Sequence, residues 1–136
     1  MAFAKLSILI KKSSLLFDKY SNQLLLQQDL TASQFKIMLV LYHSEQVVCQ
    51  GDIEKKFNMT NPTVTGLVQK LEAKGLIVRV PKDDDRRVKQ LILTQQALER
   101  KEEMLSIEQY LEDMMTKNLN EEEREQLCKL LTKLME

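Results

Sequence analysis

The sequence is poor in glycine, proline and aromatic residues, and it has no long apolar run. Its 136 residues include three Gly, two Pro and no Trp, and aromatic residues make up 5%. So few chain-breaking residues argue against long disordered linkers. No apolar stretch reaches membrane-spanning length, and lysines interrupt the short apolar run at the N-terminus, so no signal peptide is recognisable. We therefore expect one helix-rich cytoplasmic domain with no membrane segment.

Cysteine and histidine are equally scarce. Cys49 and Cys128 lie far apart and form no CxxC pair, and His43 is the only histidine, so these residues cannot supply the ligands of a metal site. The sequence also lacks a glycine-rich phosphate loop and a Ser-His-Asp arrangement. The acidic pairs at 102–103 and 112–113 are typical of a solvated helix face. We predict no metal, no cofactor and no enzymatic activity.

Charge is balanced overall but unevenly distributed. Residues 51–89 carry nine Lys/Arg against six Asp/Glu, whereas residues 90–136 carry six against eleven. A basic centre and an acidic C-terminal third fit a chain whose middle meets phosphate groups and whose end does not. Many solvated surfaces show as much asymmetry, so a more specific signal is needed.

Apolar residues at steps of three and four predict a mostly α protein with one β-hairpin, an α+β arrangement. A heptad seam from Phe3 to Leu24, interrupted only by Ser13, predicts a first helix over residues 3–28. Further helices are predicted at 31–43, 50–57, 60–74, roughly 95–118 and from Asn120 onward. The seam and the leucine stripe of the last helix favour contact with a second chain, although both could pack within one chain.

Capping residues mark several helix ends. Thr31 and Gln34 form a capping box, in which each side chain accepts from the other residue's backbone N–H. Thr60 or Asn61 caps the 60–74 helix, and Pro62 fits its first turn because the missing N–H would have no helical partner there. Gly75 suits the left-handed residue that follows the end of this helix.

Helices 50–57 and 60–74, joined by a tight turn, predict a helix-turn-helix. The apolar stripe of the second helix leaves a polar face suited to a major groove, with Lys70 and Lys74 as phosphate partners. The candidate DNA-contacting residues are Thr60, Asn61, Pro62, Thr63, Thr65, Gly66, Gln69 and Lys70. The same polar residues also suit any capped surface helix, so this helix alone does not decide the function.

A charged hairpin follows directly. The runs 76–80 and 88–93 are β-prone, and the turn between them contains three acids followed by Arg86 and Arg87. We expect Asp85 to hold Arg87, or Arg86, in an extended pose, so that less rotamer entropy is lost when the arginine enters a minor groove. Helix, hairpin and basic tip follow the order of a winged helix-turn-helix.

At this point the sequence resembles the MarR family of bacterial and archaeal regulators. Asp85-Arg86-Arg87 with Leu93-Thr94 resembles the family's wing signature, and the run from Asn61 to Ile77 resembles its recognition helix and the start of the wing. The order of six helices and one wing agrees as well. Two residues depart from the family pattern: Gly66 stands where many relatives have an arginine facing DNA, and Ala97 where a glycine often follows the Leu-Thr pair.

The resemblance implies a single domain, 1–136, that acts as a homodimer on double-stranded DNA. Residues 31–94 would form the winged helix-turn-helix lobe, and residues 1–29 and 95–136 the helical dimerisation region. Such regulators are typically repressors that bind a pseudo-palindromic operator. The resemblance therefore implies a cytoplasmic protein associated with the nucleoid. By the resemblance, Asp85 and Arg87 match the wing pair, and Thr63, Thr65 and Gln69 match positions that contact bases or phosphates.

The resemblance also implies release by a small, often aromatic, anionic effector. The site would lie where the first, second and fifth helices meet the winged lobe, and its candidate lining residues are Phe17, Tyr20, Met38 and His43. Two alternatives stay open. One is a thiol-based redox sensor using Cys49 or Cys128, and the other is a winged-helix module that binds proteins and never meets DNA.

Overall fold

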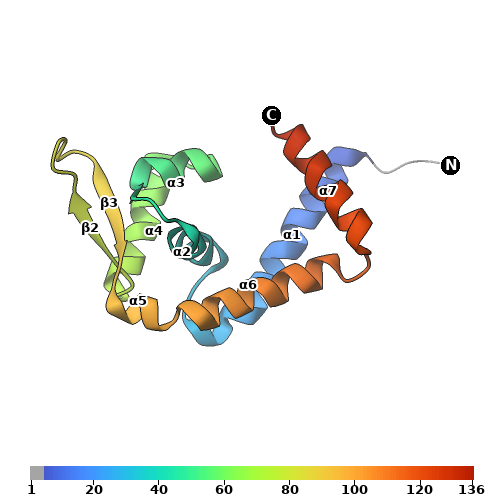
Figure 1. Ribbon diagram of the computed structural model, residues 1–136, viewed down its shortest axis with the longest axis horizontal. Helices are drawn as coiled ribbons and strands as arrows, with labels where there is room; N and C mark the ends of the chain where they lie inside the picture. Colours follow the sequence, from blue (N-terminus) through green and yellow to red (C-terminus); the bar gives the residue numbers. More distant parts are fainter. Residues whose placement is uncertain (1–4) are drawn as a thin grey trace.

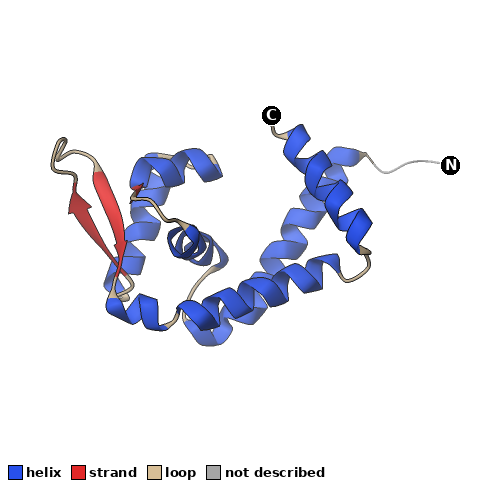
Figure 2. Ribbon diagram, in the orientation of Figure 1, coloured by secondary structure: helices blue, strands red, loops and turns tan. Residues whose placement is uncertain are grey.

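The computed structural model describes residues 5–136, so Phe3 of the predicted seam lies outside the described residues. A winged lobe and a helical arm make up the molecule (Figures 1 and 2). The lobe contains α2 (Ala32–His43), β1 (Val48–Cys49), α3 (Gln50–Phe57), α4 (Asn61–Ala73), β2 (Ile77–Pro81), β3 (Lys89–Leu93) and α5 (Gln95–Glu99). The arm contains α1 (Leu6–Leu25), the 3₁₀ turn η1 (Leu26–Gln28), α6 (Lys101–Thr116) and α7 (Glu121–Leu134).

Most of the core lies inside the winged lobe. The stripe predicted for α4 is confirmed, since Val64, Val68 and Leu71 are fully buried and Leu67 packs against them. They meet α2, α3 and the strands through Phe35, Ile53, Ile77 and Leu91, among others. The same core extends to Leu25 of α1 and Met104 of α6, and it therefore joins the lobe to the base of the arm.

The predicted hairpin is present, with a third strand beside it. The sheet is antiparallel in the order β1-β3-β2, and Val78 of β2 lies opposite Ile92 of β3. β1 pairs Val48 with Leu91 and lies directly before α3. The sequence did not predict β1, because a strand of two residues carries no periodic pattern. Its pairing with β3 fixes the start of α3 against the wing.

Both ends of α4 follow the predicted local chemistry. The Thr60 hydroxyl accepts from the backbone N–H of Thr63, and Pro62 occupies the first turn. At the other end Gly75 has a φ of 75°. There the N–H of Leu76 donates to the carbonyl of Leu71 (3.0 Å), and the N–H of Gly75 to that of Glu72 (2.9 Å). This double closure ends the helix and turns the chain directly into β2.

The single helix predicted at roughly 95–118 is wrong: α5 and α6 are separated at Arg100. The backbone N–H of Arg100 bonds to the carbonyl of Ala97 at 3.1 Å, which tightens the last turn of α5. Its guanidinium donates to the backbone oxygen and the side-chain oxygen of Gln28, at 2.9 and 3.1 Å. This contact with η1 accompanies the change of direction between lobe and arm (Figure 1).

The arm leaves large apolar surfaces exposed. α1 is shorter than predicted, because it ends at Leu25 and the chain turns at Asp29, whose φ is 56°. Only Ser21 and Leu25 of α1 are buried, and α7 has no buried residue although its Asn120–Glu123 capping box is formed. The described N-terminal part of the predicted seam and the leucine stripe therefore stay exposed in a single chain, whereas Phe17, Tyr20 and Leu24 at the other end of the seam are half-buried. None of the helices between residues 5 and 136 combines the length and apolarity required for a membrane span.

Candidate nucleic-acid interface

The polar face of α4 is open to solvent beside the wing. Thr60 through Thr63, Gln69 and Lys70 are exposed, whereas Thr65 and Gly66 are half-buried. A Cβ added at Gly66 would meet no atom within 4 Å. The glycine therefore serves no packing need within this chain, and it leaves the middle of the helix face low enough for a large partner to approach.

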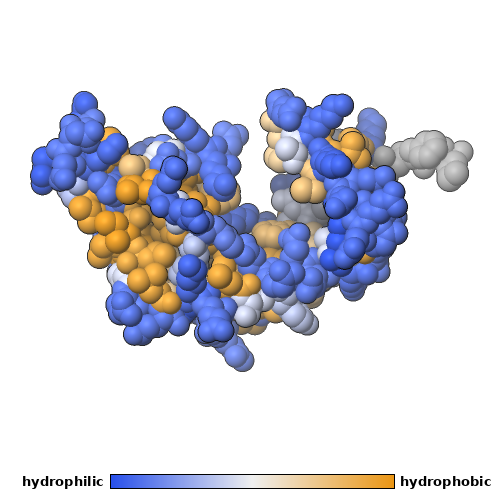
Figure 3. Space-filling view, in the orientation of Figure 1, coloured by the Kyte–Doolittle hydropathy of each residue, from blue (hydrophilic) through white to orange (hydrophobic). Residues whose placement is uncertain are grey.

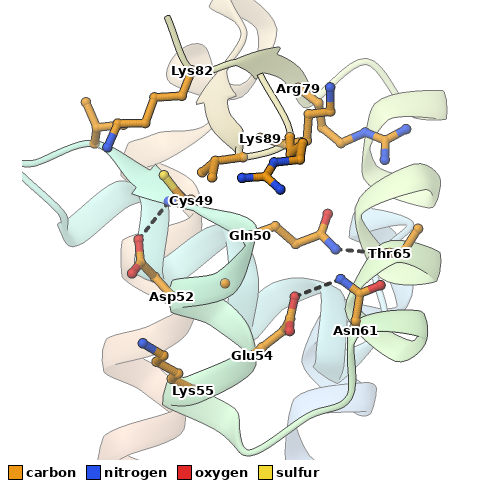
Figure 4. Close-up of a pocket in the computed structure, with 14 residues that line it drawn as sticks. Cys49, Gln50, Asp52, Glu54, Lys55, Asn61, Thr65, Arg79, Lys82 and Lys89 are labelled. Carbon is orange, nitrogen blue, oxygen red and sulfur yellow. Dashed lines mark hydrogen bonds between the residues drawn. The ribbon is translucent and has the colours of Figure 1, made fainter. Parts of the chain in front are cut away.

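Two side-chain hydrogen bonds join α3 to α4. Asn61 donates from its amide to the Glu54 carboxylate at 3.1 Å, and Gln50 donates from its amide to the Thr65 hydroxyl at 2.8 Å (Figure 4). Because an ionised carboxylate can only accept, the Asn61 amide must present its NH₂ group to Glu54. The two helices are thus held in a fixed relation by one exposed and one partly buried polar contact, in addition to the apolar core.

The wing tip contains the predicted acid–arginine pair. Arg87 donates through Nε and Nη2 to the two carboxylate oxygens of Asp85, at 3.1 and 3.3 Å, and its backbone N–H also reaches Oδ1 at 3.1 Å. This hydrogen bonding lowers the pKa of Asp85. The Arg87 side chain is nevertheless 91% exposed. Of the two arginines left open by the sequence, Arg87 is therefore the one that Asp85 holds.

Arg86, Asp83 and Asp84 lie around this pair at the exposed tip. The backbone oxygen of Arg86 accepts from the Lys89 ammonium at 3.2 Å, and Arg86 is exposed. The turn itself is closed by the N–H of Val88 donating to the carbonyl of Asp85 at 3.0 Å. The tip is consequently a defined turn with its arginines outward.

A hollow of about 660 Å³ separates the start of α3 and α4 from the base of the wing (Figure 4). Five basic side chains line it, against two acids: Lys55, Arg79, Lys82, Arg87 and Lys89, with Asp52 and Glu54. Both acids already accept hydrogen bonds within the chain. Sequence reasoning missed Gln50, Arg79, Lys82 and Lys89 as members of this surface, because only the fold brings the wing base to α3.

Lys74 does not lie on this surface. Its ammonium donates to the side-chain oxygen of Gln34 at 2.9 Å and to the backbone oxygen of Asp29, and it lies 3.8 Å from the Asp29 carboxylate. These contacts engage the ammonium within the chain and do not support the expectation that Lys74 contacts phosphate. The lysine instead ties the C-terminal end of α4 to the junction between α1 and α2.

The four predicted effector residues do not line a common pocket. Met38 is 1% exposed inside the core of the lobe, and Tyr20 is half-buried on α1. Phe17 lies beneath the Lys36 ammonium, 5.5 Å from the ring centre. His43 pairs with Glu108 of α6 through Nε2 at 2.7 Å. A hollow of about 450 Å³ is lined by His43, Glu108, Lys36, Leu39, Val40, Ser44, Lys56 and Phe57.

The two thiols lie in different settings. Cys49 is half-buried and precedes α3, where its backbone N–H donates to the Asp52 carboxylate at 2.8 Å. Cys128 is exposed on α7. Between residues 5 and 136, no cluster of three or more His, Cys, Asp or Glu side chains is arranged to hold a metal ion.

A polar helix braced by a second helix, followed by a hairpin with an ordered arginine at its tip, defines a winged helix-turn-helix protein. A family model described as the MarR family matches residues 30–89. An uncharacterized HTH-type transcriptional regulator of Bacillus cereus is 32% identical over 122 residues, which are 86% of this chain and 78% of the relative. The Bacillus subtilis regulator YdgJ is 30% identical over 105 residues, and that match spans 63% of its length, less than two thirds.

Solved structures agree over nearly all of the chain. S. aureus MepR in a complex with DNA has 34% identity and a TM-score of 0.87, covering 98% of both chains. A mutant of E. coli MarR complexed with operator DNA has 26% identity and a TM-score of 0.85, covering 96% of this chain and 94% of the other. The chain belongs to the MarR family of transcriptional regulators.

Proposed function

We propose that this protein is a sequence-specific, double-stranded DNA-binding repressor that acts as a homodimer and responds to a small ligand. The observation that carries the proposal is the wing pair, in which Asp85 holds Arg87 in place while 91% of the Arg87 side chain stays exposed. This ion pair restricts the conformations of the Arg87 side chain, yet leaves its guanidinium accessible to a partner. The DNA-bound structures of MepR and MarR support DNA as that partner.

On DNA, α4 would enter the major groove and Arg87 the adjacent minor groove. The exposed hydroxyl and amide groups of α4 suit base edges, and Thr63, Gln69 and Asn61 are the candidates. Lys70, Arg86 and the basic side chains of the wing-base hollow suit phosphate groups. Wing and helix together provide the contact area that α4 alone would lack.

The proposed homodimer is supported by the apolar surface that a single chain leaves exposed to solvent. Large side chains on α1 and α7 are exposed, and part of this apolar surface is visible on the arm in Figure 3. They are Leu6, Ile8, Leu9, Ile10, Leu15 and Leu16 on α1, and Leu127, Leu130, Leu131 and Leu134 on α7. A helix of 14 residues is marginal by itself in water. Contact with the same helices of a second chain would bury both stripes, and the two α4 helices would then reach half-sites about 34 Å apart.

The 450 Å³ hollow between α2, α3 and α6 is the best candidate for the ligand response. Its apolar lining residues are Leu39, Val40 and Phe57, and the lining side chains of Lys36 and Lys56 carry positive charge. This combination suits a small aromatic anion. Because the hollow touches both the lobe and α6 of the arm, a ligand there would change the relation between DNA-binding and dimerisation regions.

DNA binding is tested by fluorescence anisotropy with a labelled duplex at increasing salt. We expect binding at low salt that falls steeply as salt rises, because lysines and arginines displace counterions from phosphate. Arg87→Ala should lower the affinity by roughly tenfold to a hundredfold, for two minor-groove contacts of about 0.7–1.4 kcal/mol each. Arg124→Ala, which removes the same charge on α7, is the matched control. Equal binding by Arg87→Ala and Arg124→Ala would contradict the assignment of the wing, and no binding to the duplex even at low salt would favour a protein-interaction module.

A further inference from the structure

Gln50 is a buried polar side chain at the centre of the DNA-facing hollow. It is the first residue of α3 and is only 9% exposed. Figure 4 shows its amide nitrogen directed at Thr65 of α4 and its amide oxygen turned toward the base of the wing. Arg79, Lys82 and Lys89 line the hollow on that side. Because positive charge attracts the amide oxygen, this orientation of the amide is the electrostatically favoured one.

The contact fixes what the Thr65 hydroxyl can do. A hydroxyl has one proton and two lone pairs. One lone pair accepts from the Gln50 amide at 2.8 Å, so the proton is left for another acceptor. Four other helical hydroxyls, those of Ser13, Ser21, Thr116 and Thr132, use that proton on the carbonyl four residues earlier. Within residues 5–136, the Thr65 hydroxyl makes no such bond to the backbone of α4.

We propose that Gln50 is a positioning residue that presents Thr65 to DNA as a hydrogen-bond donor. This inference rests on the proposed DNA-binding function and adds the polarity of one contact. The partner is an acceptor atom of DNA, either a phosphate oxygen or an acceptor on a base edge. Thr65 lines the hollow together with Arg87 and Lys89, and these side chains attract the same negatively polarised atoms. Gln50 itself stays below the surface and reaches the DNA only through Thr65.

A double-mutant cycle separates this role from simple packing. The four proteins are wild type, Gln50→Met, Thr65→Val and the double variant. Gln50→Met nearly conserves volume, and Thr65→Val removes the hydroxyl but keeps the β-branched shape. The affinity is measured for a duplex selected from a random pool and for an unrelated duplex of equal length. We expect each single variant to bind the selected duplex about tenfold more weakly, from about threefold at each of two half-sites. In the Thr65→Val background, Gln50→Met should change the affinity less than about twofold, because the contact is already lost.

Thr65→Ser keeps the hydroxyl and serves as the conservative control, with an affinity within about twofold of wild type. An equal loss on both duplexes assigns the acceptor to phosphate, and a loss confined to the selected duplex assigns it to a base. Additive losses in the cycle would overturn the proposal, because Gln50 would then act independently of Thr65. Equal binding by wild type, Thr65→Val and Thr65→Ser would also overturn it, and this comparison leaves Gln50 untouched. If wild type bound neither duplex in a salt-sensitive manner, the proposed function itself would fail.

Discussion

Removing the Asp85 carboxylate should weaken DNA binding even though it removes a negative charge from the tip of the wing. The reason is that Asp85 holds Arg87 through two side-chain contacts and one backbone contact. Asp84 lies next to Asp85 at the exposed tip and carries the same charge, so Asp84→Ala measures the effect of the charge alone. We expect Asp84→Ala to bind DNA equally well or slightly better, because a nearby repulsive charge is gone.

The size of the Asp85 effect follows from its exposure. A solvent-exposed ion pair such as this one changes an equilibrium about threefold. A dimer uses two wings, so Asp85→Ala should bind roughly tenfold more weakly than Asp84→Ala. The side-chain hydrogen bond from Arg87 lowers the pKa of Asp85. The ion pair is therefore fully formed at any pH above the ordinary aspartate pKa, and it is lost only as the pH falls through the lowered pKa. Neutral pH is therefore suitable for the assay.

The assay is fluorescence anisotropy at about 0.15 M salt, where long-range charge effects are partly screened. Arg87→Ala and the Asp85→Ala/Arg87→Ala double variant complete the set. Once Arg87 is absent, removal of Asp85 should cause no further loss of affinity, since Asp85 then has no side chain to hold. Binding by Asp85→Ala that equals or exceeds binding by Asp84→Ala would refute the role of Asp85.

Two further predictions concern the arm and the end of α4. Leu130 on α7 is 64% exposed, and Leu130→Glu would place a charge in the apolar interface. In sedimentation experiments this variant should raise the dimer dissociation constant on the order of 100-fold. Leu98→Glu on α5 is the control, and an equal effect of the two variants would contradict the proposed interface. Gly75→Ala should lower the free energy of unfolding by about 1–2 kcal/mol in urea, because φ is 75° and the added Cβ would lie 3.0 Å from the Gln96 side chain. Gly66→Ala should instead be neutral or stabilising by up to about 1 kcal/mol, since space is open there, and a loss at Gly66 would show that this reasoning fails.

Local chemistry explains which parts of the fold the sequence predicted. The Thr31–Gln34 capping box and the start and end of α4 are confirmed, because neighbouring residues form each of these features. The pairing within the wing tip was predicted for the same reason, since Asp85 and Arg87 are two residues apart. Features of this kind need only the identity and spacing of residues close in the sequence.

Long-range contacts explain what the sequence did not predict. The break at Arg100 accompanies a contact with Gln28, 72 residues away. The contacts of Lys74 with Asp29 and Gln34 were not predicted because they join distant parts of the chain, and Gln50 was missed because Thr65 is on another helix. A periodic pattern in α5 and α6 gives no sign of such pairings. The contacts of the predicted DNA-binding residues with DNA stay a prediction.

The effector site shows the same limit. Met38 has the apolar spacing of a pocket residue and of a core residue alike, and the structure places it in the core. His43 lines the hollow between lobe and arm because α6 returns to α2, which the helix pattern alone does not indicate. The proposed ligand site therefore rests on how the fold brings Lys36, Lys56 and His43 together around one hollow, and the ligand response stays a proposal.

Selection of bound duplexes from a random pool tests the central claim most directly, because it reports sequence preference and dimer geometry together. We expect enrichment of an inverted repeat whose half-sites are about 10 base pairs apart, centre to centre, as two α4 helices on one face of DNA require. Recovery of unenriched sequences, or of a single half-site without a symmetric partner, would contradict a dimeric, sequence-specific regulator.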